Sequence, residues 1–216
     1  MNMSKPDFSR ELFHLEQGRE FVCGVDEAGR GPWAGPVVAA AVIFKPDANS
    51  NLTAGSIPYS IPAGLDDSKR LTSDARSALY DKIVDCSIWA TGIADITRID
   101  QMNILHSSLW AMSEAVKALS QQPDFVLVDG NKLPDFQGIN AETIVKGDQK
   151  SVSIAAASIV AKVTRDRMME QLDIEFPEYC WASNKGYGTK AHQEALSSHG
   201  VTVHHRRSFK PIKALL

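Results

Sequence analysis

The sequence has few cysteines, and they are not paired. Cys23, Cys86 and Cys180 are far apart in the chain and form no Cys-x-x-Cys motif. A disulfide framework needs many cysteines, and a cysteine-ligated zinc site needs closely spaced ones. This scarcity therefore excludes both and indicates a reducing compartment.

Long hydrophobic runs and a large charge of one sign are also missing. No apolar stretch approaches the length of about 20 residues that spans a membrane, and the first ten residues lack the apolar centre of a signal peptide. The formal net charge is only −3, so the chain lacks the overall basicity of proteins that coat nucleic acid. Nucleic-acid binding would need a local basic patch. We expect a soluble, cytoplasmic protein with no membrane partner.

The length and the pattern of apolar residues indicate an α/β fold. With 216 residues, 44% of them hydrophobic, the chain is long enough for one domain with a substantial core. Short continuous apolar runs predict buried strands, and apolar residues at helical spacing predict helices. The predicted strands cover residues 21–25, 37–44, 87–94, 124–128 and 142–145, the predicted helices cover 73–86, 103–119, 151–176 and 190–199, and 45–63 is a long loop.

The most specific stretch is the first apolar run and the two acids that end it. Asp26 and Glu27 directly follow residues 21–25. Two adjacent carboxylates beside a buried strand are costly unless a positive group meets them, and a bound cation is the simplest one. The alternative is a solvated acidic pair at a strand end.

A glycine-rich turn follows these acids. Gly29 and Gly31 flank Arg30, which permits positive φ angles and a close approach of the backbone to a ligand, with one fixed cation between the two glycines. This arrangement suits a phosphate or a sugar.

Two later segments repeat the pattern of a strand followed by an acid. Asp129 and Gly130 end the fourth predicted strand, and Lys146-Gly147-Asp148 follows the fifth. Either acid alone could be only a turn or cap residue. In a sheet whose strand ends lie together, however, Asp129 and Asp148 would meet the first two acids at the edge where α/β folds bind ligands.

Carboxylates without nearby histidine or cysteine favour Mg²⁺ or Mn²⁺ as the cation. Two such ions about 4 Å apart can align a water and stabilise a leaving oxygen in phosphodiester hydrolysis, so a nuclease is the sharpest hypothesis. One difficulty is that successive strand residues point to opposite faces. The chain must turn at Glu27, or Glu27 must contribute its backbone carbonyl.

Other polar residues are candidates for substrate contact. Ser68 and Lys69 precede the helix predicted at 73–86 and suit either a phosphate or a capped helix start. Tyr187 stands between two glycines and is either a stacking platform or a surface side chain. The tail at 204–211 is basic and contains an aromatic residue, which fits nucleic-acid contact.

Taken together, these blocks resemble the type 2 ribonucleases H, specifically the bacterial ribonuclease HII family. The resemblance extends from about residue 21 to about residue 211. It is carried, in family order, by the blocks VDEAGRGP (25–32), DSKRLT (67–72), LVDG (127–130), KGD (146–148), AAASI (155–159), AKVTRD (161–166) and KGYGT (185–189).

This resemblance implies an RNase H-like fold, with a mixed five-stranded sheet flanked by helices and a small helical C-terminal part at 177–216. It divides the chain into an N-terminal segment at 1–20 and a catalytic domain at 21–216. It implies cleavage of RNA in RNA·DNA hybrids and incision at single ribonucleotides in duplex DNA, with 3′-hydroxyl and 5′-phosphate ends. Mg²⁺ or Mn²⁺ would be the cofactor, and we expect a monomer.

The same resemblance implies roles for individual residues. The metal-binding catalytic acids would be Asp26, Glu27, Asp129 and Asp148. The groups that read the ribonucleotide and its junction with DNA would be Gly29, Arg30, Gly31 and Tyr187, and the phosphate contacts would be Ser68, Lys69, Lys146 and Arg165. From its sequence context alone, however, pairing with neighbouring residues is the favoured explanation of Arg165.

Two other classes of function compete with the nuclease. A non-catalytic nucleic-acid-binding module could keep this fold, but four intact acids disfavour it. A phosphotransferase acting on a small nucleotide would need a phosphate cradle, and no GxxxxGK[ST] motif occurs. Within type 2 enzymes, the context of Tyr187 and the absence of an additional N-terminal domain argue against ribonuclease HIII.

Overall fold

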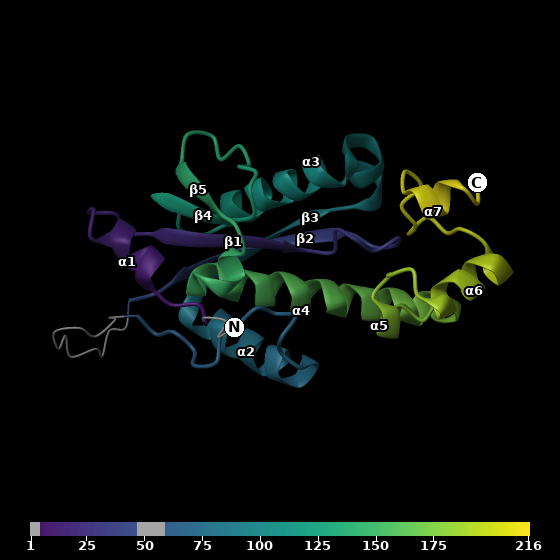
Figure 1. The fold of residues 1–216 in the computed structure, drawn as a ribbon, viewed down its shortest axis with the longest axis horizontal. Helices are drawn as coiled ribbons and strands as arrows, with labels where there is room; N and C mark the ends of the chain where they lie inside the picture. Colours follow the sequence, from purple (N-terminus) through teal and green to yellow (C-terminus); the bar gives the residue numbers. More distant parts are fainter. Residues whose placement is uncertain (1–4, 47–58) are drawn as a thin grey trace.

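A five-stranded mixed sheet forms the centre of the molecule (Figure 1). The computed structural model describes residues 5–46 and 59–216, so most of the predicted loop at 45–63 lies outside the described part. The sheet order is β3-β2-β1-β4-β5; β1, β2 and β3 pair antiparallel, and β4 and β5 add in parallel to β1. The predicted mixed sheet is confirmed. The strands are β1 Val22–Ala28, β2 Val37–Phe44, β3 Ser87–Ala94, β4 Phe125–Asp129 and β5 Asn140–Ile144.

The longer helices lie close to their predicted positions. They are α2 Ser73–Cys86, α3 Ile96–Lys117, α4 Val152–Glu175 and α6 Lys190–His199. The sequence did not predict the short helices, which are α1 Ser9–Leu15, α5 Trp181–Asn184 and α7 Lys210–Lys213, with 3-10 turns η1 at Gly147–Gln149 and η2 at Pro177–Tyr179. None of the helices in the described residues is long and apolar enough to cross a membrane.

The helix α3 is interrupted where the sequence predicted a helix start. Asn103 has a φ of 66°, and its Oδ1 accepts hydrogen bonds from the N–H groups of Leu105 and His106 at 3.0 and 3.2 Å. Asn103 thus caps the second part of α3, which begins where the helix at 103–119 was predicted to begin. The first part, before this cap, was not predicted.

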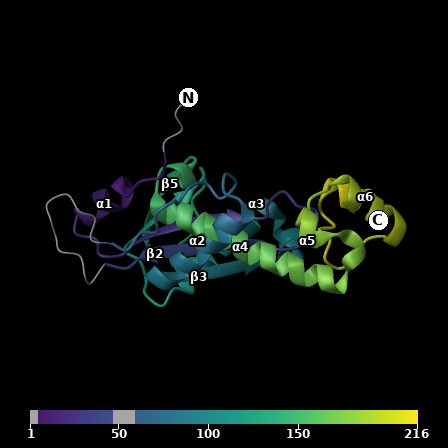
Figure 2. The ribbon, with the colours of Figure 1, turned by 90° about the horizontal axis from the view of Figure 1, so that it is seen from below.

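Helices cover both faces of the sheet. α3 packs on one face, and α4 with α2 packs on the other (Figures 1 and 2). Small residues bring α4 very close to β1: a Cβ added at Gly24 would collide with the backbone of Ser153 and Ile154. This close approach places the N-terminal end of α4 beside the central strand.

The C-terminal part is a small helical unit at the far end of α4 (Figure 1). It has its own core, in which Trp181 and Ile212 are completely buried and Tyr179 and Leu196 nearly so. Met169 of α4 completes this core. The unit is therefore fixed to the sheet domain through α4.

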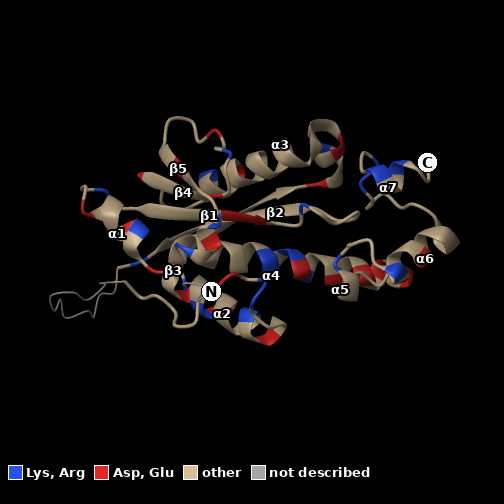
Figure 3. Cartoon of the chain, in the orientation of Figure 1, with Lys and Arg blue, Asp and Glu red and all other residues tan. Residues whose placement is uncertain are grey.

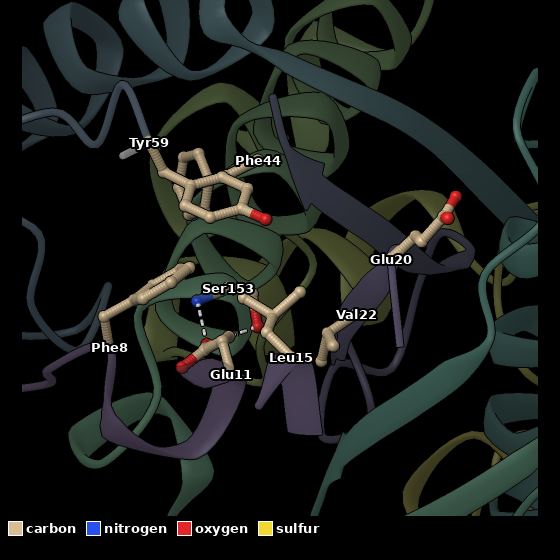
Figure 4. A pocket seen from close by; sticks show the side chains of 8 residues that line it. All are labelled: Phe8, Glu11, Leu15, Glu20, Val22, Phe44, Tyr59 and Ser153. Carbon is tan, nitrogen blue, oxygen red and sulfur yellow. Dashed lines mark hydrogen bonds between the residues drawn. The ribbon is translucent and has the colours of Figure 1, made fainter. Parts of the chain in front are cut away.

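The N-terminal helix α1 is tied to the start of α4 by one buried carboxylate (Figure 4). Glu11 is 1% exposed, and its Oε1 accepts hydrogen bonds from Ser151 Oγ, Ser153 Oγ and Ser153 N at 2.5 to 2.9 Å. Its Oε2 has no partner within the described residues, and Glu11 is one of the residues that line a cavity of about 10 Å³. Burial raises the pKa of Glu11. A negative group at a helix N-terminus is favourable, so Glu11 fastens the segment that leads into α4.

Replacing Glu11 with alanine should destabilise the fold, because three buried donors at the start of α4 would lose their acceptor. We expect the free energy of unfolding to fall by about 2–4 kcal/mol, measured by urea denaturation. Glu16→Ala, at an exposed position that ends the same helix, is the control. A loss no larger than that of the control would contradict this role for Glu11.

Candidate active site

Asp26 and Glu27 lie within β1 and not after it. The strand continues to Ala28, with Asp26 opposite Ala40 and Glu27 opposite Ala39 of β2. The turn that one reading of the sequence placed at Glu27 is wrong, because regular pairing with β2 continues past this residue. The two side chains therefore point to opposite faces of the sheet. The turn comes at Gly29, whose φ is 97°.

Asp129 is the last residue of β4, the strand beside β1. Its Oδ1 accepts a hydrogen bond of 2.6 Å from the N–H of Gly147. Gly147 begins η1, which contains Asp148, and follows Lys146 in a left-handed conformation with a φ of 56°. This bond holds the loop of Asp148 against the end of β4, and the structure thereby brings acids from three separate segments to one place.

Mutual repulsion shows how close these acids lie. Burial, followed by the charges of Glu27 and Asp129, raises the pKa of Asp26 well above its ordinary value. Burial also raises the pKa of Glu27, although Arg30, 3.4 Å away, opposes this effect. Burial and the neighbouring acids raise the pKa of Asp148 to about 6. The negative end of β1 is visible at the centre of Figure 3.

Sequence reasoning missed a fifth acid, Asp67. It is 8% exposed and is the strongest charged influence that raises the pKa of Asp148. Its Oδ1 accepts from the N–H of Lys69 at 2.9 Å. Burial lowers the pKa of Lys69, but Asp67, Asp26, Asp148 and Asp129 outweigh it, so this pKa is raised. Asp67 directly precedes Ser68 and Lys69, two predicted substrate contacts, and this position in the sequence could have identified it as a site residue.

A cavity of about 330 Å³ opens beside these acids. Its lining includes Asp26 and Glu27, the turn at 29–31, Ser68 with Lys69, and Tyr187. Ser68 is buried, and its Oγ lies 2.8 Å from Ser158 Oγ of α4. Most of the predicted site residues therefore surround one cavity.

Tyr187 lies next to the glycine-rich turn, and both line this cavity. A Cβ added at Gly31 would lie 3.3 Å from the Tyr187 ring, and the tyrosine is 47% exposed. Its carbonyl lies 2.9 Å from Nδ1 of His192, whose Nε2 accepts from Trp181 Nε1 at 3.2 Å. This pattern assigns the proton to Nδ1. The buried histidine thus fixes the loop that carries Tyr187.

Two of the predicted phosphate contacts differ from Ser68 and Lys69, because one lies outside the cavity lining and the other is bonded to main-chain carbonyls. Lys146 is exposed and is not part of the cavity lining. Arg165 borders the cavity but is only 1% exposed, and its three nitrogens donate to the carbonyls of Ala34, Pro36 and Lys185 at 2.9 to 3.1 Å. In this structure the guanidinium of Arg165 connects the loop at 34–36 to the loop at 185. This agrees with the alternative prediction that Arg165 pairs with other residues of the protein.

The acids suit a hard divalent cation by their chemistry. Within the described ranges, no three His, Cys, Asp or Glu side chains are close enough to form a ready-made ligand cage. Asp26, Asp129 and Asp148 nevertheless supply oxygen donors from adjacent segments, and their mutual repulsion is what a divalent ion would relieve. Glu27, on the opposite face, can add a main-chain carbonyl.

Comparison with known proteins identifies the family of this chain. The family model described as Ribonuclease HII matches residues 23–212. The chain belongs to the ribonuclease HII family. It is 49% identical to the Ribonuclease HII of Magnetococcus marinus over 98% of this chain and 95% of the relative. It is 51% identical to that of Shewanella amazonensis over 94% and 91% of the two chains.

A solved structure supports the fold. The ribonuclease H2 from Pyrococcus horikoshii superposes with a TM-score of 0.71 at 27% identity, and the match covers 91% of this chain and 97% of the other. The family resemblance inferred from the motifs is therefore confirmed, and so is the expected mixed five-stranded sheet flanked by helices in this chain.

Without metal, the stability that Asp148 contributes should be lost as the pH rises. A carboxyl group whose pKa is raised in the folded state contributes stability that is fully present below its unfolded pKa, about 4. That contribution is lost as the pH rises through the folded pKa, about 6 for Asp148. We expect the free energy of unfolding, measured in EDTA, to fall less steeply over this range in Asp148→Asn than in the parent. Parallel profiles would contradict the raised pKa.

Proposed function

We propose that the chain is a divalent-metal-dependent endoribonuclease. It hydrolyses the RNA strand of RNA·DNA hybrids and incises on the 5′ side of single ribonucleotides in duplex DNA, a step in ribonucleotide removal. The observation that carries this proposal is the gathering of Asp26, Asp129 and Asp148 beside a cavity lined by a glycine-rich turn. Membership of the ribonuclease HII family supports it.

The acids would hold Mg²⁺ or Mn²⁺, with Asp26, Asp129 and Asp148 as side-chain ligands and Glu27 through its backbone or its carboxylate. Bound there, the ions would supply an activated water and charge stabilisation at the scissile phosphate. The Gly147 N–H fixes one oxygen of Asp129 and leaves the other for a ligand. As the resemblance to the family implies, hydrolysis would leave 3′-hydroxyl and 5′-phosphate ends.

The cavity offers groups that tell RNA from DNA. Only the 2′-hydroxyl distinguishes one ribonucleotide from its deoxy counterpart, and it both donates and accepts hydrogen bonds. The turn formed by Gly29, Arg30 and Gly31 exposes main-chain groups to the cavity, and Tyr187 faces this turn. We assign 2′-hydroxyl recognition to the turn and stacking on the neighbouring deoxyribose to the tyrosine.

Phosphate contacts complete the substrate site. Ser68 and Lys69 line the cavity, and exposed Lys146 can reach the backbone of a long duplex. Such contacts position a duplex without sequence preference. We propose that the enzyme acts as a monomer.

Asp129→Asn should abolish cleavage but leave binding to an RNA·DNA hybrid nearly unchanged. Asparagine keeps the oxygen that accepts from Gly147 N but removes the charge a metal ligand needs. We expect kcat to fall at least about a thousandfold, in the range reported for loss of a key catalytic group, with Kd within about threefold. Asp81→Asn, exposed on α2, is the control. Full activity of the Asp129 variant would remove this residue from the mechanism.

Tyr187→Ala should reduce incision at a lone ribonucleotide more than turnover of a long hybrid. Loss of one stacking contact costs about 1–3 kcal/mol, or roughly ten- to a hundredfold in kcat/KM on the substrate that depends on it. Tyr187→Phe keeps the ring and should retain most of the preference if stacking is its source. Equal losses on the two substrates in the alanine variant would contradict junction reading.

A further inference from the structure

Arg206 belongs to the basic tail for which nucleic-acid contact was predicted, but the structure buries it as a cation beneath the glycine-rich turn. It is 0% exposed. No carboxylate forms an ion pair with it among the residues that the structure describes. Burial lowers its pKa to about 9, so it stays charged at neutral pH. A buried charge without an anion is costly, and its hydrogen bonds therefore need an explanation.

The guanidinium of Arg206 donates only to main-chain carbonyls in the described bonds. Nη2 lies 2.6 Å from the carbonyl oxygen of Gly29, and Nη1 lies 3.0 Å from that of Arg30. Nε and Nη2 bond the carbonyls of Gly35 and Pro36 at 2.9 and 3.1 Å. The rigid fork of an arginine suits such multiple contacts, whereas a lysine amine is a single point. Arg206 thus connects the turn at 29–30 to the segment at 35–36.

These bonds set the direction of two N–H groups. The carbonyl of Gly29 belongs to the same peptide group as the N–H of Arg30, and the carbonyl of Arg30 to that of Gly31. The described peptide bonds are all trans, and in a trans peptide the C=O and N–H point in opposite directions. Because these two carbonyls point toward buried Arg206, the N–H groups of Arg30 and Gly31 point away from it. They point to the side on which Arg30 and Gly31 are exposed.

The cavity beside the acids lies on that exposed side, since Gly29, Arg30 and Gly31 line it. A cation on a carbonyl also strengthens the N–H of the same peptide group as a donor, because hydrogen bonds in series polarise one another. Two oriented and polarised donors next to the scissile position suit a sugar hydroxyl oxygen.

We propose that Arg206 is a positioning residue for ribonucleotide specificity. By holding the Gly29 and Arg30 carbonyls from the buried side, it directs the N–H groups of Arg30 and Gly31 at the 2′-hydroxyl of the substrate. This inference rests on the proposed function, because it concerns how that site distinguishes a ribonucleotide from a deoxyribonucleotide.

The test compares binding of two duplexes that differ by one 2′-hydroxyl. In an Asp129→Asn background, which prevents cleavage, Kd is measured for a duplex with one ribonucleotide and for the all-DNA duplex. Arg206→Lys keeps the charge but loses the fork, and we expect the preference for the ribonucleotide to fall about tenfold or to vanish, with all-DNA binding unchanged. Arg207→Lys, the same substitution at the adjacent exposed position, should keep the preference.

Other outcomes would overturn the inference. An unchanged preference in Arg206→Lys, or an equal loss of affinity for both duplexes in a folded variant, would show that Arg206 does not act on specificity. A thermal melt establishes whether the variant is folded. The proposed function is tested separately, by incision of the ribonucleotide duplex by the parent chain. A failure of the proposed function can therefore be told from a failure of the inference about Arg206.

If Arg206→Lys does not fold, the parent chain decides the question. The amide resonances of Arg30 and Gly31 in isotope-labelled protein are compared after addition of each duplex. We expect them to shift differently with the ribonucleotide duplex than with the all-DNA duplex. Identical shifts with the two duplexes would overturn the inference.

Discussion

The structure depends on holding several carboxylates together although they repel one another. Asp26 is fixed in a central strand paired on both sides, and Asp129 is fixed by the Gly147 N–H. The same fixed geometry raises the pKa of Asp26 and Asp148. Rigid packing of the small residues of α4 against β1 keeps the acids from moving apart. The site therefore opposes folding without a cation and is suited to binding one.

A second constraint fixes the substrate-reading loops. Arg165 and Arg206 both donate to the carbonyl of Pro36, so two buried arginines share one acceptor between the sheet domain and the C-terminal unit. Through Lys185 O, Arg165 also reaches the loop of Tyr187, which His192 holds from the other side. The chemistry thus lies on the strands, while recognition lies on loops that buried side chains keep rigid.

Much of this arrangement could be predicted from the sequence, because it follows from short-range patterns. Continuous apolar runs located the strands, and the repetition of a strand followed by an acid pointed to one edge of the sheet. Long-range contacts left no such signal. In the sequence, Arg206 is part of a basic tail and Glu11 is part of a polar N-terminal segment. In the structure both are buried, with hydrogen-bond partners that are far away in the sequence. The turn expected at Glu27 was wrong because pairing with β2 extends the strand.

The most direct test of the central claim is incision of a DNA duplex that contains one ribonucleotide, with Mg²⁺ or Mn²⁺ and an EDTA control, beside an all-DNA duplex. The account predicts a single cut on the 5′ side of the ribonucleotide, abolished by EDTA, and no cut in the all-DNA duplex. Tight binding without cleavage in either metal would contradict it and favour a non-catalytic nucleic-acid-binding module.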